Sequence, residues 1–195
     1  MLPFSEACER NKDPILGILR EAFADLSGVV EIGSGSGQHA VYFARRLSHL
    51  DWQPTDRAEN LPTLAARVAL DGPPNLRSPV ELDVTSASWP FVRTDAVFSA
   101  NTLHIMSWAE VVSFFRGVGR ILGPGGLLAV YGPFRYAGRY TSESNAAFDR
   151  GLRERDAASG IRDFEAVSEL AAGQGLAPLA DHAMPANNQL LLWRR

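Results

Sequence analysis

The chain is poor in residue types that mark several classes of protein. Its 195 residues include a single cysteine, Cys8, which excludes an internal disulfide and a thiolate metal cluster. The four histidines lack the spacing of metal ligands, so no metal site is predicted. Positive charge is not in excess, because 19 basic residues face 22 acidic ones. The net charge of −3 gives no general reason to bind nucleic acid or an anionic membrane.

Long apolar stretches are missing as well. No uninterrupted apolar run reaches the roughly 18 residues needed to cross a bilayer, and residues 1–12 lack a charged-then-apolar leader. We therefore expect no membrane partner and a cytoplasmic location. The length and the ordinary hydrophobic fraction of 46% fit one globular domain over residues 1–195. These properties predict nothing about the oligomeric state.

The most informative segment runs from Val29 to Ala40. A β-branched run is followed by an acidic residue, then by glycines at alternate positions, and then by a helical pattern. A strand that turns sharply into a helix leaves backbone N–H groups free, and glycine lets a ligand approach the main chain. The dinucleotide fingerprint requires a small residue at the third conserved position, where this chain has Gln38.

The acidic residue in this segment narrows the choice of ligand further. Glu31 lies two residues before Gly33, a poor place for a carboxylate beside a pyrophosphate. It suits a ligand with an ammonium group or another positive centre, and S-adenosylmethionine has both. The motif therefore favours S-adenosylmethionine over NAD. Its candidate cofactor-binding residues are Glu31, Gly33, Ser34, Gly35 and Gly37.

Strand and helix patterns alternate along the rest of the chain. Strands are expected at 29–32, 50–56, 79–84, 95–101, 127–131, 176–182 and 189–193. Helices are expected from an Asp13-Pro14 start to Gly28, after Gly35, at 60–70, from a capping box of Ser107 and Glu110 to about residue 122, and at 163–170. The last two strands are joined by a short link and should form an antiparallel hairpin. This alternation predicts an α/β fold with a mostly parallel Rossmann-like sheet covered by helices on both faces.

Polar residues end three further strands of this sheet. Ligands of such sheets bind outside the carboxyl ends of the strands. Asp56, about 20 residues beyond the glycines, is expected to accept bonds from ribose hydroxyls. Asp83 is expected to accept from an adenine amino group while Val84 packs on the ring, and Asn101 lies where the sulfonium would be. A single acid at a strand end is weak support, but several in register with the glycine turn are much stronger.

At this point the sequence resembles the class I S-adenosylmethionine-dependent methyltransferases, and within them a methyltransferase-like family of unknown function. Residues 9–15, 31–39, 101–105, 131–134, 141–145, 148–149, 152–156 and 160–163 carry the resemblance. It implies a seven-stranded sheet of order 3-2-1-4-5-7-6 and the cofactor S-adenosylmethionine, but no particular substrate. The family commonly has Pro-x-Trp after its Arg-Asp, where this chain has Ala157-Ala158-Ser159, so an aromatic contribution from that point is not expected.

Two segments exceed the minimal fold, an N-terminal arm at 1–13 and an insert at 132–162. The insert is polar and aromatic and fits either a substrate-side lid or a solvated helical hairpin, and the resemblance favours the lid. Tyr140 and Asn145 in it are candidate residues on the acceptor side. His104 is the candidate general base or orienting group, with a histidine hydrogen-bonded at a helix start as the alternative.

These observations predict a methyltransferase for a small-molecule acceptor. Asn101 is followed by Thr-Leu-His, so the Asn-Pro-Pro-Tyr type motif used on nucleobase and amide nitrogens is absent and no nucleic-acid substrate is expected. The alternative from another class is a non-catalytic module that binds S-adenosylmethionine or S-adenosylhomocysteine and regulates a partner. A nicotinamide-dependent dehydrogenase is the third hypothesis.

Overall fold

A seven-stranded sheet forms the centre of the molecule in the computed structural model, which describes residues 2–195. Its strands are β1 (Gly28–Ile32), β2 (Asp51–Asp56), β3 (Val80–Glu81), β4 (Thr94–Ala100), β5 (Leu122–Gly132), β9 (Ala177–Met184) and β10 (Asn188–Arg194). They lie in the order β3-β2-β1-β4-β5-β10-β9, which confirms the expected order. Only β10 pairs antiparallel, with β5 and with β9, so the terminal hairpin is confirmed too.

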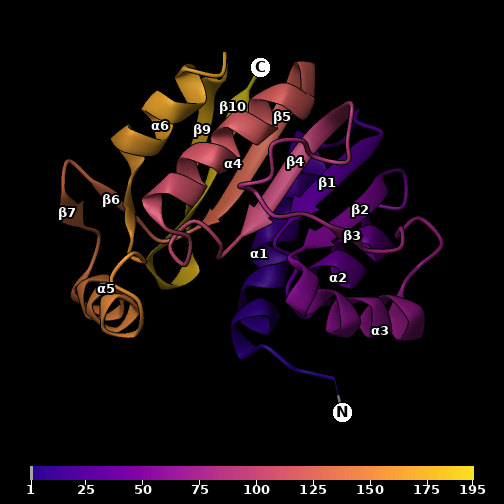
Figure 1. The fold of residues 1–195 in the computed structure, drawn as a ribbon, viewed down its shortest axis with the longest axis horizontal. Helices are drawn as coiled ribbons and strands as arrows, with labels where there is room; N and C mark the ends of the chain where they lie inside the picture. Colours follow the sequence, from indigo (N-terminus) through magenta and orange to yellow (C-terminus); the bar gives the residue numbers. More distant parts are fainter. Residues whose placement is uncertain (1) are drawn as a thin grey trace.

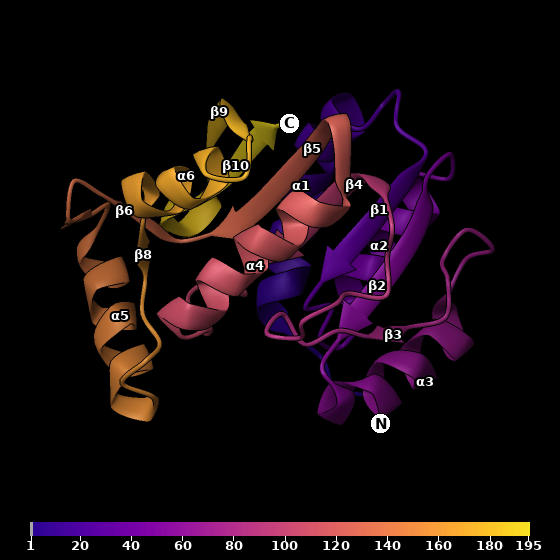
Figure 2. The ribbon, with the colours of Figure 1, turned by 45° about the horizontal axis from the view of Figure 1, so that its top comes forward.

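Helices cover both faces of this sheet, as Figures 1 and 2 show. They are α1 (Glu6–Ala22), α2 (Gln38–Arg46), α3 (Leu61–Asp71), α4 (Trp108–Ile121) and α6 (Phe164–Ala172). Helix α5 (Glu143–Arg155) lies to one side of the sheet, and short 3-10 turns occur at Ala58–Asn60 and Pro185–Asn187. Side chains alternate along the strands: Val29 packs with α1 and α2, whereas Val30 packs with α4 and α6. This period of two divides the core into two apolar layers.

The start of α1 differs from the expected one. The helix begins at Glu6, because the Ser5 side chain accepts a hydrogen bond from the backbone N–H of Cys8 and so caps it. Pro14 lies inside the helix and not at its first turn. The expected arm at 1–13 is therefore largely helical. The helix also ends early, at Ala22, so that Gly28 begins β1 instead of closing α1.

Other boundaries follow the sequence patterns more closely. The capping box of Ser107 and Glu110 is present at the start of α4, with both reciprocal hydrogen bonds. The third strand is much shorter than expected, since only Val80 and Glu81 pair with β2. The chain then leaves the sheet in a turn at Asp83, whose carboxylate accepts hydrogen bonds from Thr85.

The segment between β5 and α6 forms a structure of its own beside the main sheet. Three short strands, β6 (Phe134–Tyr136), β7 (Arg139–Tyr140) and β8 (Arg162–Asp163), make a small sheet of order β7-β6-β8. Helix α5 lies next to it, and Asp149 on this helix accepts from the Tyr140 hydroxyl at 2.7 Å and from the Ile161 N–H at 2.6 Å. The insert is thus a folded unit and not an open loop.

None of the helices formed by residues 2–195 combines the length and the apolar character required to traverse a bilayer.

Candidate functional site

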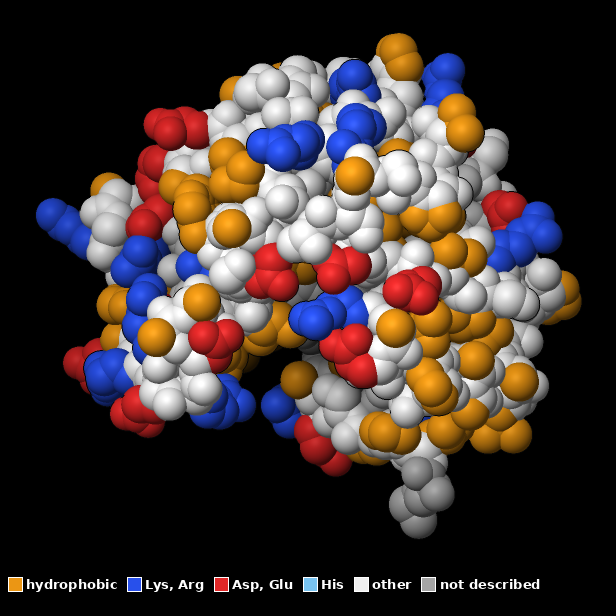
Figure 3. All heavy atoms as spheres, viewed as in Figure 1, with side chains coloured by type: hydrophobic (Ala, Val, Ile, Leu, Met, Phe, Trp, Pro, Cys, Tyr) orange, Lys and Arg blue, Asp and Glu red, His pale blue; other side chains and the backbone are white. Residues whose placement is uncertain are grey.

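A cavity of about 570 Å³ opens where β1, β2 and β4 end, and the turn after β3 contributes to its wall. This volume lies within the range of about 300–1,000 Å³ typical of small-molecule and cofactor sites. Figure 3 shows the molecular surface hollowed between the α5 side and the α2–α3 side, with acidic and basic side chains at the rim. Of the expected cofactor residues, the wall contains Gly33, Ser34, Gly35, Asp56, Asp83, Val84 and Asn101.

The glycine turn has the conformation that its sequence predicts. Gly33 and Gly35 have φ of 75° and 55°, a region in which other residues are strained. A Cβ on Gly33 would lie 2.5 Å from Cγ2 of Thr102, whereas a Cβ on Gly35 would meet nothing within 4 Å. Gly33 is therefore required for packing against the β4–α4 loop, and Gly35 keeps the main chain open to the cavity. Ser34 closes the turn, because its hydroxyl accepts from the Thr55 N–H.

Asp56 is held at the end of β2 by three donors. One carboxylate oxygen accepts from the Gly35 N–H at 2.6 Å, and the other accepts from the Arg57 N–H at 2.8 Å and from Nδ2 of Asn60 at 2.7 Å. The side chain is buried yet lines the cavity. These bonds fix the carboxylate beside the glycine turn, the arrangement expected for recognition of vicinal hydroxyls.

Asp83 and Val84 form the neighbouring part of the wall. The Asp83 pKa is lowered because Thr85 donates two hydrogen bonds to its Oδ1, so the carboxylate is ionised at neutral pH. No donor from the described residues is bonded to Oδ2 of Asp83. Val84 is buried and presents an apolar surface beside it.

Glu31 has surroundings different from those expected. Its side chain is 2% exposed, does not belong to the cavity wall and accepts a hydrogen bond from Nε1 of Trp52 at 2.9 Å. Burial raises its pKa from 4.5 to about 7, which the bond from Trp52 only partly offsets. Direct contact between this carboxylate and a ligand in the cavity is therefore not supported.

Gly37 is also set back from the cavity. It has φ of 77° and precedes α2, and a Cβ there would lie 2.9 Å from Cδ1 of Leu64. Its role in this structure is the close packing of α2 against α3. The expected contact of Gly37 with the ligand has no counterpart in the cavity wall.

Asn101 and His104 line the cavity together with Phe148 of α5. Asn101 has φ of 59°, a strained conformation for a residue with a side chain, and such strain is common at functional sites. The His104 ring makes edge-to-face contact with Phe148 at 5.4 Å between ring centroids. Burial lowers the His104 pKa to about 4, helped by the charges of Arg162 and Arg155, so the imidazole is neutral at pH 7.

The His104 ring nitrogens have no hydrogen-bond partner in the described part of the chain. Among residues 2–195, no hydrogen bond reaches either ring nitrogen; only the His104 carbonyl is bonded, to the Gly160 N–H at 2.9 Å. The alternative of a histidine ring hydrogen-bonded at a helix start thus has no support here. The loop that carries His104 is fixed by Arg162, whose guanidinium donates to the carbonyls of Leu103, Met106 and Ala158.

A second cavity, of about 330 Å³, adjoins the first. Its wall includes Asn101, His104 and Phe148, which also line the first cavity, together with Pro133, Ser144, Asn145, Ala186 and Asn188. Asn145 thus lines this second cavity, and its place on the acceptor side stays a prediction. Tyr140 lines neither cavity, and its hydroxyl is bonded to Asp149.

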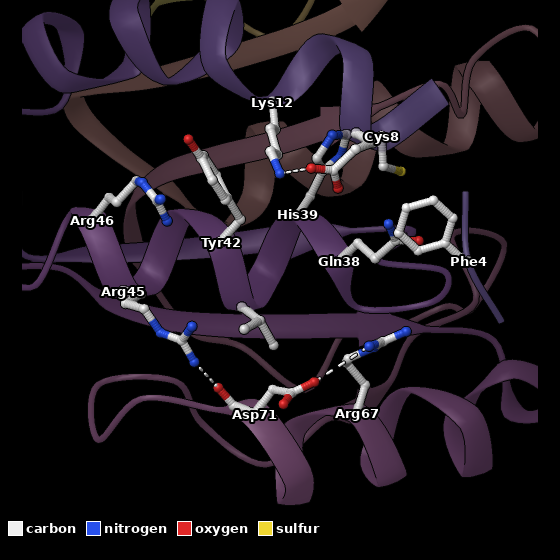
Figure 4. A pocket seen from close by; sticks show the side chains of 12 residues that line it. Phe4, Cys8, Lys12, Gln38, His39, Tyr42, Arg45, Arg46, Arg67 and Asp71 are labelled. Atoms are coloured by element: carbon white, nitrogen blue, oxygen red, sulfur yellow. Dashed lines mark hydrogen bonds and ion pairs between the residues drawn. The ribbon is translucent and has the colours of Figure 1, made fainter. Parts of the chain in front are cut away.

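A third hollow, shown in Figure 4, lies between α1, α2 and α3 and contains several basic side chains. Two of them pair with acids, Lys12 with Glu9 and Arg67 with Asp71 at 3.3 Å. Arg45 donates to the Asp71 carbonyl at 2.6 Å, and Arg46 lies over the Tyr42 ring, 3.7 Å from its centroid.

Several cavity residues were not found from the sequence. Ser5 and Cys8 come from the start of α1, which the sequence analysis placed outside any helix, and Asn60 lies four residues after Asp56. Phe148 stands in one of the segments that carry the family resemblance, without an assigned role. That resemblance and the i, i+4 spacing from Asp56 were the available signals.

The comparisons with known proteins agree with this geometry. An O-methyltransferase family protein from Burkholderia thailandensis superposes with a TM-score of 0.84 at 18% identity, covering 97% of this chain and 57% of that chain. The S-adenosylmethionine-dependent methyltransferase SibL gives 0.79 at 21% identity, with coverage of 96% and 55%. An O-methyltransferase family 2 protein from Planctomyces limnophilus, solved with apigenin, gives 0.76 at 14% identity, with coverage of 94% and 61%.

The chain spans somewhat more than half the length of these structures, and at such identities the likeness shows the fold. The fold is that of the class I methyltransferases. A family model described as "Protein of unknown function (DUF938)" matches residues 2–195. The chain thus belongs to the DUF938 family of proteins of unknown function.

Proposed function

We propose that the protein is an S-adenosylmethionine-dependent methyltransferase that acts on a small-molecule acceptor. One observation carries the proposal: a single cavity brings together the Gly33–Gly35 turn, Asp56, Asp83 with Val84, and Asn101. These come from four separate strand ends, and each offers the chemistry that one part of the cofactor needs. The names of the structurally similar proteins, which are methyltransferases, add support.

Each group has a part in holding the cofactor. The open main chain at Gly35 would receive the methionine end, and the Asp56 carboxylate would accept from the ribose hydroxyls. Asp83 has an oxygen, Oδ2, to which no donor of residues 2–195 is bonded and which could accept from the adenine amino group, and Val84 offers an apolar surface to the ring. Asn101 would lie near the sulfonium. Glu31 would act indirectly, by supporting the turn from behind.

The protein's part in the reaction is mainly positioning. When bound, the cofactor supplies a methyl group already activated by its sulfonium. The walls of the two cavities orient the acceptor and exclude water, and a neutral His104 ring can take a proton from the attacking atom. Residues 132–162 would form the substrate side of a single domain, and the N-terminal arm at 1–13, in which residues 6–13 begin α1, would cover the cofactor side.

Calorimetry with S-adenosylhomocysteine tests the binding site. Asp56→Asn removes the charge that accepts the ribose hydroxyls and should weaken binding by at least about tenfold, since hydrogen bonds to charged groups contribute about 1.5–3 kcal/mol. Asp51→Asn is the matched control, because this exposed acid lies at the opposite end of β2 and pairs with Arg77. Equal affinities for both variants and the unmodified protein would remove Asp56 from the site.

Turnover is tested separately, with labelled S-adenosylmethionine and a pool of small metabolites. Formation of S-adenosylhomocysteine that depends on the pool supports the enzyme. Tight binding of the cofactor without turnover on any pool would favour the regulatory module instead.

A further inference from the structure

The second cavity continues the first, and its wall has a distinct chemistry. Three residues, Asn101, His104 and Phe148, belong to both walls, so a molecule in the second cavity would adjoin one in the first. The remaining wall comes from the start of α5, from Pro133 after β5, and from the turn between β9 and β10. These segments lie far apart in the sequence and meet only in the fold.

Asn145 presents an oxygen to this cavity. Its Nδ2 donates to Oγ1 of Thr141 at 2.8 Å and to the carbonyl of Asn187 at 2.8 Å, which uses both amide hydrogens. The bond to a carbonyl also fixes which end of the amide is the nitrogen, because a carbonyl can only accept. The side chain is 6% exposed, and no donor from residues 2–195 is bonded to its Oδ1. The free group is therefore a hydrogen-bond acceptor.

Asn188, in the same wall, repeats the arrangement. Its Nδ2 donates to the carbonyls of Pro185 at 3.2 Å and Ala186 at 3.3 Å, so both of its amide hydrogens are used as well. Its oxygen has no bonded donor among the described residues. Two asparagines whose nitrogens are occupied thus leave two oxygens for a ligand.

The other described residues of the wall add no positive charge. Apart from His104, none of the side chains that line this cavity is acidic or basic. The imidazole of His104 is neutral at pH 7, because burial lowers its pKa. Phe148, which is 41% exposed, adds an aromatic face. An anion placed here would lose its hydration without meeting an ionised cationic side chain of the wall, which is costly.

We propose that this second cavity is the acceptor site and that it takes an uncharged ring compound bearing O–H or N–H donors, not a carboxylate or a phosphate. This inference rests on the proposed function, since it takes the first cavity as the cofactor site. The ring would pack on Phe148, and its donors would bond to the oxygens of Asn145 and Asn188. The attacking hydroxyl or amine would face His104 at the junction of the two cavities.

The test compares three probes on the protein saturated with S-adenosylhomocysteine, with binding followed by NMR. Resorcinol is uncharged and has two O–H donors, 1,3-dimethoxybenzene keeps the ring but has no donor, and 3,5-dihydroxybenzoate adds a negative charge. We expect resorcinol to bind at least about tenfold more tightly than either of the others, as the loss of two hydrogen bonds or the burial of a charge predicts.

Variants connect this preference to the two asparagines. Asn188→Ala changes a half-buried residue at the start of β10, and Asn145→Leu removes the unbonded oxygen of a buried side chain. Each should weaken resorcinol binding about three- to tenfold and leave S-adenosylhomocysteine affinity unchanged. Gln53→Ala is the control, because this amide lies on β2 away from both cavities and bonds to Pro54 and Ser78. If Asn145→Leu fails to fold, Asn188→Ala alone decides the point.

The outcomes separate the two proposals. Resorcinol that binds no better than dimethoxybenzene, or a carboxylate that binds as well as resorcinol, overturns the donor-bearing acceptor while leaving the cofactor site intact. Absence of S-adenosylhomocysteine binding refutes the proposed function itself. Loss of resorcinol affinity in Gln53→Ala equal to that in Asn188→Ala would also overturn the inference.

Discussion

Glu31 gives the sharpest test of the structure, because its carboxyl group is both buried and titratable near neutral pH. Its pKa is raised from 4.5 to about 7 by burial behind the glycine turn, and Asp56 adds a smaller repulsion. A carboxyl group with a higher pKa when folded holds its proton more tightly in the folded state. The protein should therefore lose stability as the pH rises from about 4.5 to about 7. Glu31→Gln removes this titration and retains an oxygen that can accept from Nε1 of Trp52.

The expected magnitude follows from the pKa difference between the unfolded and folded states. At about 1.36 kcal/mol for each pH unit, a pKa of about 7 instead of 4.5 costs about 3 kcal/mol at high pH. As the pH rises from 5 to 8.5, the free energy of unfolding of Glu31→Gln should increase by about 2–3 kcal/mol relative to that of the unmodified protein. For a chain of this size, this difference corresponds to roughly 5–10 °C in Tm.

Urea unfolding of both proteins at several pH values measures this difference. The comparison cancels the titration of His39 and His104, whose lowered pKa values raise stability with increasing pH between about 4 and 6.5 in both proteins. Glu154→Gln, a change at an exposed acid on α5, is the control and should leave the pH dependence unaltered. If Glu31→Gln and the unmodified protein change in parallel with pH, the burial argument is refuted.

Two further predictions concern the glycine turn and the base. Gly33→Ala should lower the free energy of unfolding by roughly 1–3 kcal/mol, since the new Cβ would lie 2.5 Å from Cγ2 of Thr102 and the backbone has positive φ. Thr102→Ser removes that methyl group and should restore part of the lost stability. If urea unfolding of the double variant shows no restoration, the contact is contradicted. Because the pKa of His104 is about 4, the rate of methyl transfer should stay constant from pH 7 down to about 5 and fall only as the ring becomes protonated near pH 4. A fall in rate centred near pH 6.5 would show that the ring is not buried as described.

Local signals in the sequence predicted much of the cofactor side. The glycines at 33 and 35 need positive φ, and their strand and helix neighbours have the periods that the structure shows. Asp56 and Asp83 follow strands whose ends meet at one edge of a parallel sheet, so their arrival at the same cavity follows from the strand order. Each of these features depends on a few adjacent residues and on a general rule of sheet topology.

Local sequence signals did not predict the residue at which α1 starts. Asp13-Pro14 is a good local start, but Ser5 supplies another cap, and the turn before Pro14 is held by contacts across the molecule. Asn11 bonds to the His39 ring at 2.7 Å, and the Ser5 N–H donates to Gln38 at 2.6 Å. Contacts between residues about 30 positions apart stabilise this turn despite the proline inside the helix.

The sequence by itself determined the class of fold and the side of the sheet on which a ligand would bind, because these depend on local periodicity and glycine geometry. The expected order of the strands came from the family resemblance. Only the tertiary structure decided what each polar group faces. It turned Glu31 towards Trp52 and away from the cavity, and it used the Asn145 nitrogen on the carbonyl of Asn187, 42 positions away. Burial determines the protonation state of a group in a site, and long-range hydrogen bonds determine which polar atoms remain free to bind a ligand. Both depend on residues far apart in the sequence.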